Sequence, residues 1–580
     1  MATLVDVYAE LFPDAPNRRK PFGSVPLLPA DLFAFSAHLL ERSGAYHHVV
    51  PVVNGPRREN YRKVLVDAEM RTWATTYGRV WRSGHQRPLP NPPPEVAQVW
   101  EQLEAFRGAD VYEALDETAD PPGWWRICLL LLMVSDEASV GIGFDPQNPF
   151  TAFTSNAYVQ EDLSSGEVFR RIKRAPFSLS SAAEDVLCVQ AKSRTPSVGC
   201  TLRSLTHHLA LLPPRGEVRA RWVEPPFANG ARQSDQDKLG LLLIPFPYRV
   251  TDDSFHPAGL DPSSDWGWFR AQQTWLPGDK DKSRRRVLID FVQDLIDSAR
   301  QSGDRVDSVV LPELALNYQQ FLSLARSLAK DRQIDFLISG VSQNEHGRHG
   351  NFVAIAPFFL LGPERSGQIQ GWERLILVRE KHHRWKMNGE QLNNYGLMGL
   401  DSNKSWWEDL TILGRSLDVM VYRNRTTLTT LICEDLARVD PCQAVVRAVG
   451  PDLLIALLMD GPQLGHRWPG RYATVLADDP GTSVLCFTSF GLIARQNDIG
   501  KFAQASSIAL WKDEKEGIRP LELSREADAL LLHIEVKQKN EHTLDGRSDG
   551  GASNRWEYKG HRQVTASSKP SWIASGEGRR

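Results

Sequence analysis

Cysteine is scarce in this sequence, and its spacing argues against two kinds of stabilising site. No two of the six cysteines form a CxxC pair, so the sequence indicates neither a zinc cluster nor a disulfide framework. We therefore expect the protein to work in a reducing cytoplasm. The six are Cys128, Cys188, Cys200, Cys433, Cys442 and Cys486.

Long apolar runs and an excess of charge of one sign are also missing. The longest strongly apolar run, ICLLLLMV at 127–134, is far short of a membrane span, and residues 1–20 lack the apolar core of a signal peptide. The net charge of -3 gives no basic excess that would attract nucleic acid or anionic lipid. We expect a protein that is neither secreted nor membrane-spanning and does not bind nucleic acid.

The length of 580 residues exceeds what one hydrophobic core usually serves, so we expect several domains. Residues 212–238 are polar, rich in turn residues and without apolar periodicity, which indicates a boundary. From residue 538 the chain is rich in Gly, Ser, Lys and Arg and poor in aliphatic residues. The sequence therefore predicts an N-terminal domain over 1–235, a second domain over 236–537 and a mobile polar tail over 538–580.

The second domain alternates between apolar strands and amphipathic helices. Strands that are apolar at nearly every position, separated by helices, favour an α/β fold with a sheet covered on its faces. Helix-like and strand-like segments also mix in the first domain, which we expect to be mixed α/β. In the second domain the predicted strands are 239–247, 306–316, 334–342, 351–360, 374–380, 426–433 and 451–459, and the predicted helices are 285–302 and 321–332.

Three of these strands end in a reactive side chain: VVLPELAL contains Glu313, LILVREKHH contains Lys381, and LTTLICEDLA contains Cys433. Strand ends are where an α/β fold presents functional groups to a cleft. Each residue alone has an ordinary structural explanation, because a lone cysteine is usually a core residue and charged residues usually lie on the surface. The occurrence of all three at strand ends favours a functional site.

At these residues the chain resembles the carbon–nitrogen hydrolase (nitrilase) superfamily, over roughly 236–536. PE of VVLPELAL, EK of VREKHHRWKMNGE and ICED match the glutamate, lysine and cysteine motifs of the family in the same order. The resemblance implies a four-layer αββα sandwich, a homo-oligomer, and no metal or organic cofactor. It also implies that Cys433 is the nucleophile, Glu313 the general base, and Lys381 a stabiliser of the oxyanion.

Supporting residues follow from the same resemblance. Glu390 is the candidate for a further carboxylate that positions the lysine or the water, and the backbone N–H of Glu434 would assist at the oxyanion. Glu434 after the cysteine, where nitrile-hydrolysing members commonly have tryptophan, favours an amide substrate. His382 and His383 have no catalytic part in the family, and they are candidates for shaping the substrate pocket. The long segment 386–410 could gate the site.

The sequence thus predicts hydrolysis of a small-molecule amide, through a cysteine thioester, by Glu313, Lys381 and Cys433. Amide transfer to an acceptor other than water stays open. The rival hypothesis is a signalling or bacterial defence protein in which this domain serves as sensor, effector or scaffold. In the leading hypothesis too, we expect the N-terminal domain to bind a regulatory ligand or a protein partner.

The polar segment 190–214 in the first domain has two interpretations. Its basic and hydroxyl side chains around Gly199 could cradle a phosphate, but a surface loop leading into a strand is the simpler interpretation. A second thiol site made by Cys200 and His207 has no further support. LADD at 476–479 resembles a polymerase metal motif, but Pro480 follows where that hairpin needs a pairing strand. The polar side chains of 190–214 are Lys192, Arg194, Thr195, Arg203, His207 and His208.

Overall fold

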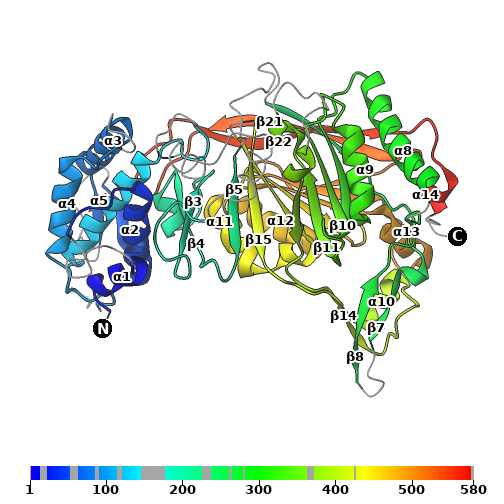
Figure 1. Ribbon diagram of the computed structural model, residues 1–580, viewed down its shortest axis with the longest axis horizontal. Coiled ribbons are helices and arrows are strands. Elements are labelled where there is room, and N and C mark those ends of the chain that lie inside the picture. The colour runs from blue at the N-terminus through cyan, green and yellow to red at the C-terminus, as the bar shows by residue number, and fades with distance from the viewer. Residues whose placement is uncertain are drawn as a thin grey trace.

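A computed structural model of the chain shows two units joined end to end. Figure 1 places the N-terminal helices at one end and two large sheets at the other. We call residues 2–212 the N-terminal unit and residues 219–575 the two-sheet unit. The structure describes residues 2–13, 23–52, 63–84, 90–113, 120–145, 150, 177–224, 237–259, 264–278, 281–361, 371–423 and 426–575.

The N-terminal unit is mainly helical. Its apolar helix α5 (Gly123–Ala138) packs against α2, α3 and α4. The side chains that it buries include Trp124, Trp125, Leu129, Leu131, Leu132 and Met133. Two small sheets complete the unit, one of β1 and β2 in parallel and one of β3 and β4 antiparallel. The bounds are α1 Leu4–Leu11, α2 Pro29–Ser43, β1 Val49–Pro51, β2 Val64–Val66, α3 Ala68–Ser83, α4 Pro94–Glu104, β3 Cys188–Ala191 and β4 Leu209–Leu212.

The first large sheet has seven strands in the order β12-β11-β10-β9-β6-β21-β22. Its centre, β6, β9 and β10, is parallel, and both edges are antiparallel. Every residue of β9 is buried, as expected for a strand covered on both faces. The bounds are β6 Lys238–Leu243, β9 Ser308–Leu316, β10 Phe336–Gln343, β11 His349–Ala356, β12 Leu377–Glu380, β21 Ala529–Lys539 and β22 Ser553–Val564.

The second large sheet has the order β20-β19-β18-β17-β16-β15-β5. Strands β16, β17 and β18 run parallel and are buried throughout, because nearly every residue in them is aliphatic, aromatic or threonine. The bounds are β5 Arg219–Val223, β15 Ser416–Tyr422, β16 Thr426–Ile432, β17 Leu453–Leu458, β18 Ser483–Thr488, β19 Ser507–Lys512 and β20 Arg519–Glu522.

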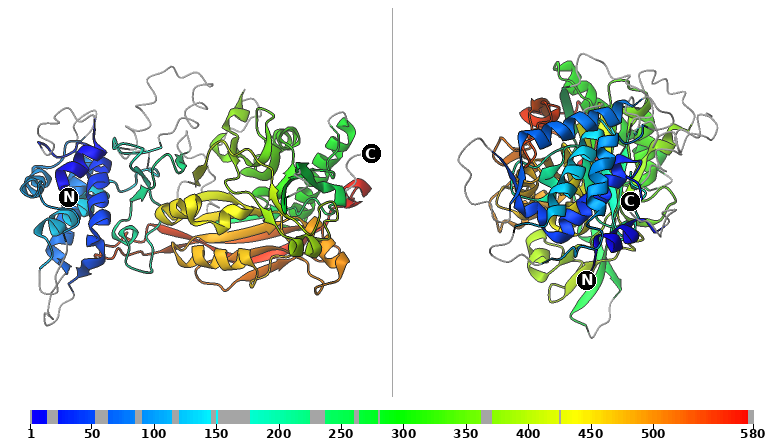
Figure 2. Two further views of the ribbon diagram at one scale, coloured as in Figure 1. Left: turned by 90° about the horizontal axis from the view of Figure 1, so that it is seen from below. Right: turned by 90° about the vertical axis from the view of Figure 1, so that its left-hand side faces the viewer.

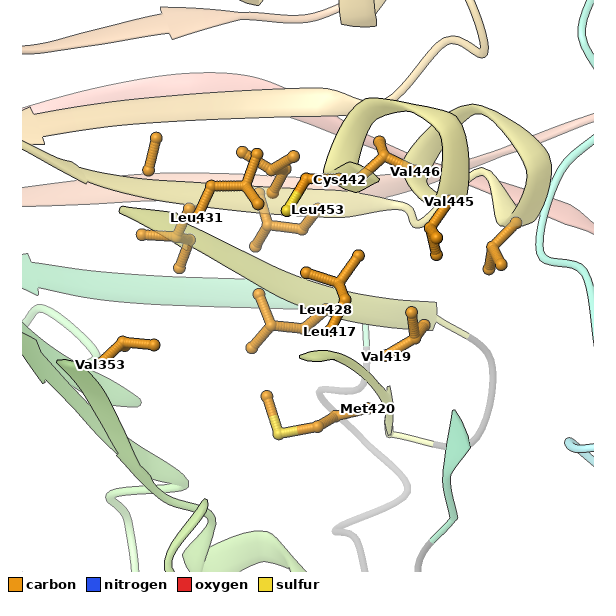
Figure 3. Close-up of a cluster of buried hydrophobic side chains, with 14 of the residues drawn as sticks. Val353, Leu417, Val419, Met420, Leu428, Leu431, Cys442, Val445, Val446 and Leu453 are labelled. Atoms are coloured by element: carbon orange, nitrogen blue, oxygen red, sulfur yellow. The ribbon is translucent and has the colours of Figure 1, made fainter. Parts of the chain in front are cut away.

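Helices lie against both large sheets. In the first sheet α9 (Tyr318–Leu328) packs on β10 and β11, and α8 (Lys282–Gln301) contacts β22; in the second, α12 (Trp468–Asp478) packs on β18 and β19. The sheets also contact each other, through β9 with β17 and β11 with β16. Figure 3 shows apolar side chains of β11, β15, β16 and β17 in one cluster with residues 442–446, at the start of α11 (Ala444–Val449). This is the α/β fold that the sequence predicts.

A smaller sheet, ordered β13-β14-β8-β7, projects from the body of the two-sheet unit (Figure 1). It is built from residues 255–271 and from the long segment after the lysine motif, which also forms α10 (Gly389–Tyr395). The sequence analysis did not predict these strands. Their bounds are β7 Phe255–Gly259, β8 Trp266–Ala271, β13 Lys386–Met387 and β14 Ser405–Glu408, and α13 (Phe490–Ile499) packs against α10.

Two predicted boundaries differ from the structure. The prediction of a mobile tail over 538–580 is wrong for residues 553–575, because β22 pairs along its whole length with β21 and α14 (Ser571–Ser575) follows it. The predicted linker 212–238 contains β5, which pairs in parallel with β15 and buries Ala220 and Trp222. In β5 the buried Ala220 and Trp222 alternate with arginines, and in β22 only Trp556, Tyr558 and Val564 are apolar, so polar neighbours hide both strands in the sequence. Residues 225–236 and 576–580 lie outside the described residues.

None of the helices in the described part of the chain combines the length and the apolar content that crossing a membrane requires.

Candidate functional site

The three predicted strand-end residues lie in the positions that their motifs suggest. Glu313 is in the C-terminal half of β9, Lys381 follows β12 directly, and Cys433 follows β16 directly. All three are buried, with 1%, 1% and 4% of their surface exposed. The backbone turns sharply beside two of them, since Leu314 has a φ of 54° and Cys433 a φ of 43°. Such left-handed conformations are strained for residues other than glycine, and they gather at functional sites.

Lys381 is held by two buried carboxylates. Its Nζ lies 3.0 Å from Oε1 of Glu313 and 2.7 Å from Oε2 of Glu408, and its backbone N–H donates to the carbonyl of Asn351 at 2.8 Å. Burial alone would lower the pKa of Lys381, but the charges of Glu313 and Glu408 outweigh it and hold that pKa well above its ordinary value. The lysine therefore stays charged inside the protein.

Glu313 shares a donor with the second carboxylate. The side-chain amide of Asn351 donates to Glu313 at 2.8 Å and to Glu408 at 2.9 Å, so it bridges them. Oε2 of Glu313 is buried and has no hydrogen-bond partner among the described residues. Burial raises the pKa of Glu313, and the neighbouring charge of Glu408 raises it further, against the lowering effect of Lys381. A carboxylate with a raised pKa and a free oxygen is suited to accept a proton.

The thiol of Cys433 is protonated in this environment. Burial raises its pKa well above the ordinary value, and the charge of Glu313 raises it further, while Lys381 lowers it. The three side chains thus lie within electrostatic range of one another. A thiol that is neutral at rest needs a base at the moment of reaction, and Glu313 is the carboxylate with the largest effect on it.

The supporting carboxylate differs from the predicted one. Glu390 lies in the first turn of α10, exposed, and has no recorded contact with Lys381 among the described residues. Glu408 at the end of β14 contacts the lysine instead, and its position is fixed by the backbone N–H of Trp385 at 3.0 Å. Sequence reasoning missed Glu408 because it lies in an unpredicted strand. The side chain of Glu434 pairs with Arg438 in the next turn.

Asp435 ties the lysine segment to the cysteine segment. Its Oδ1 accepts the backbone N–H groups of His382 and His383 at 3.0 Å each, and Arg379 lies 3.3 Å from its Oδ2. Burial alone would raise the pKa of Asp435, but the hydrogen bond from His383 and the charges of His382 and Arg379 lower it to about 2. His382 is itself buried, which lowers its pKa to about 4. Both histidines therefore organise the site.

Two cavities occur in the two-sheet unit, and neither is lined by Glu313, Lys381 or Cys433. One, of about 1020 Å³, opens beside the segment that follows the lysine and is lined by His382, His383 and Arg384 together with tryptophans of the small sheet. The other, of about 430 Å³, lies near the ends of β17 and α10 and includes Tyr395 and Asp460. Within the described ranges, no group of His, Cys, Asp and Glu side chains is arranged to hold a metal ion.

The polar segment 190–214 serves the fold. Lys192 donates from its buried Nζ to backbone and side-chain oxygens at 203–206, and Arg194 pairs with Asp452 of the two-sheet unit at 2.9 Å. Arg203 pairs with Asp479, which follows α12, so LADD ends a helix instead of forming a hairpin. These basic groups already have acceptors, but Lys192 and Arg194 are only 3% and 1% exposed, so the segment is not the surface loop of the simpler interpretation.

Comparison with known proteins gives structural matches alone. No protein-family model and no curated protein matches the sequence. An amidase from Nesterenkonia sp. matches with 15% identity and a TM-score of 0.30, over 54% of this chain and 94% of the amidase. A carbon–nitrogen hydrolase superfamily protein from Xanthomonas campestris matches with 15% identity and a TM-score of 0.25, over 43% of this chain and 76% of its own.

A third match is Nit3 from Saccharomyces cerevisiae, a member of branch 10 of the nitrilase superfamily. It has 12% identity and a TM-score of 0.26, over 49% of this chain and 84% of its own. Similarity at this level says nothing about the substrate of this chain. The chain is similar to solved members of the carbon–nitrogen hydrolase superfamily, the family that its three motifs resemble.

Proposed function

We propose that this protein hydrolyses a non-peptide C–N bond in a small amide, through a thioester on Cys433. The observation that carries the proposal is the buried cluster in which Lys381 bridges Glu313 and Glu408 while Glu313 and Lys381 both act on the thiol of Cys433. A structural role alone does not explain a buried thiol on a strained backbone beside a carboxylate with an unpartnered oxygen.

The first half of the reaction forms the thioester. Glu313 takes the thiol proton as Sγ of Cys433 attacks the amide carbon, and the new S–C bond leaves negative charge on the former carbonyl oxygen. Lys381 and the backbone N–H of Glu434 stabilise that charge; removing one such donor typically costs about 3 kcal/mol of transition-state stabilisation. The C–N bond then breaks, and Glu313 gives its proton to the departing amine.

The second half consumes one water. Glu313 accepts a proton from that water as its oxygen attacks the thioester carbon, and Lys381 again stabilises the oxyanion. The S–C bond breaks to release the carboxylic acid, and the proton held by Glu313 returns to the sulfur. Glu408 keeps Lys381 charged and in place through both halves. An acceptor amine in place of water would give amide transfer at the same groups.

The proposal extends to the fold and the partners. We propose that the two sheets and their helices form the four-layer αββα sandwich that the resemblance implies, and that the protein is a homo-oligomer, as the same resemblance implies. We propose that the N-terminal unit, which is joined to the two-sheet unit by buried ion pairs such as Arg194 with Asp452, binds a regulatory ligand or protein partner. The rival function, a sensor or scaffold in signalling or defence, needs no reactive thiol.

Thiol labelling separates the two functions. Chloroacetamide, a small amide electrophile, is expected to alkylate Cys433 in the folded protein, with intact mass and peptide mapping as the readout. Glu313→Gln should slow this labelling by about 10²-fold or more, because the general base is lost. Cys433→Ala removes the label, whereas Cys486→Ala, at another buried thiol, should keep it. A folded wild-type protein whose Cys433 resists alkylation would refute the enzyme.

A further inference from the structure

The cavity of about 430 Å³ lies beside Asp460, just past the end of β17. β16 and β17 are parallel neighbours, with Ile432 paired to Leu457, so Cys433 and Asp460 leave the sheet on the same edge. Thr488 at the end of β18 fixes Asp460 by accepting its backbone N–H at 3.0 Å. Ligands of open α/β sheets bind outside this edge. The polar and aromatic residues that line the cavity include Tyr395, Asp460, His466, Arg467, Trp468 and Gln496.

Asp460 is the most distinctive group in this lining. It is 5% exposed, and all of its recorded side-chain hydrogen bonds go to Oδ1: one from the Tyr395 hydroxyl, one from Nη2 of Arg467 at 2.7 Å, and one from the backbone of Gly461 at 2.8 Å. Oδ2 is buried, and within the described residues it has no hydrogen-bond partner. A buried carboxylate oxygen without a donor is costly, so a ligand that supplies one is favoured.

The charge around this cavity indicates what kind of donor fits. Around the thiol, Glu313 and Glu408 face one cation, Lys381, while Asp460 faces Arg467, whose side chain is 21% exposed. These two groups together hold one more carboxylate than cations, and the surplus lies at Lys381. The charge of Asp460 also contributes to the raised pKa of Cys433, after burial, Glu313 and Glu434. A cationic N–H donor meets both requirements.

We propose that this cavity binds the far end of the substrate, and that it selects amides whose other end carries a protonated amine, bound by Oδ2 of Asp460. The inference rests on the proposed function, since it places the scissile amide at Cys433. Tyr395 and Arg467 hold the carboxylate from the Oδ1 side and leave Oδ2 for the ligand. The volume is within the range of small-molecule pockets. Because Tyr395 belongs to α10, the long segment after the lysine shapes the specificity.

Three amides of matched size test the inference on the wild-type protein. 4-Aminobutanamide carries the ammonium group, pentanamide replaces that group with methyl, and succinamate has a carboxylate in place of the terminal CH2–NH3+. Each is used to protect Cys433 from alkylation by chloroacetamide, and ammonia release is followed in parallel. 4-Aminobutanamide is expected to protect at concentrations at least about tenfold below those of the other two, the effect of one charge-assisted buried hydrogen bond.

Equal protection by all three amides, better protection by succinamate, or no protection by 4-aminobutanamide would overturn the inference while leaving the proposed function standing. Failure of chloroacetamide to label Cys433 at all would overturn the proposed function instead. Asp460→Asn should abolish the preference for the ammonium group, and Asp498→Asn, at an exposed aspartate that pairs with Arg249, should retain it. If Asp460→Asn does not fold, the wild-type series still decides.

Discussion

Replacing Glu408 by glutamine tests which carboxylate supports the lysine. Lys381 lies 2.7 Å from Glu408 and 3.0 Å from Glu313, and all three side chains are at least nine-tenths buried. At an effective dielectric constant of about 20, the Glu408 contact is worth about 6 kcal/mol of Coulomb attraction. The repulsion between Glu408 and Glu313, lost in the same variant, offsets part of it. We therefore expect Glu408→Gln to lower the free energy of unfolding by about 3 kcal/mol.

Urea titration of wild type, Glu408→Gln and Glu390→Gln measures this effect. Glu390 is exposed, so its variant should stay within about 0.5 kcal/mol of wild type. The pH dependence of Cys433 labelling gives a second readout. Because the charge of Glu408 raises the pKa of Glu313, the acid limb should move to lower pH in Glu408→Gln. An unchanged unfolding free energy for Glu408→Gln, or an equal loss for Glu390→Gln, would refute this account of the lysine site.

Three further predictions concern packing, domain contact and pH. Gly340→Ala would bring a Cβ within 2.4 Å of the Glu313 backbone, so we expect urea titration to show a free energy of unfolding lower by about 1–3 kcal/mol, and Cys433 labelling to be slower. Gly517→Ala, where the new Cβ meets open space, should leave both unchanged. Arg547→Met removes the cation that pairs with the buried Asp136 and Glu137, so we expect the free energy of unfolding to fall by about 3–5 kcal/mol. Arg562→Met, at an exposed arginine, should lower it by less than about 1 kcal/mol, and equal losses would contradict the prediction. His382 has its pKa lowered to about 4 from 6.5, so the unfolded chain takes up the proton first. Neutral His382 therefore contributes about 3 kcal/mol to the free energy of unfolding above pH 6.5, and this contribution is lost as the pH falls through 4. In His382→Gln, the free energy of unfolding measured by urea titration should change less between pH 6.5 and 4.

Two of the strands that lead to the reactive residues could be predicted, because β9 and β16 consist largely of aliphatic and threonine residues next to conspicuous polar ones. Glu408 could not, because SWWE in β14 is four residues long and gains its partners from β8, which is more than a hundred residues away in sequence. Asp460 was missed for a similar reason. What marks it as a candidate ligand site is the pair of donors that hold its Oδ1, Tyr395 and Arg467, and no local sequence pattern associates them with it. Composition also misled at β22, where lysine, arginine and glycine on the open face of an edge strand resemble a disordered tail.

The hairpin of β21 and β22 has a consequence for the order in which the chain can assemble. Its strands complete the sheet that contains Glu313, and the connection between them reaches the N-terminal unit, where Arg547 enters the acidic end of α5 (Figures 1 and 2). During synthesis, a chain that has emerged only as far as residue 520 has neither the strand that covers β6 nor the arginine that neutralises Asp136. The neutralisation of Asp136 and the completion of the sheet that contains Glu313 therefore both depend on residues made late in synthesis.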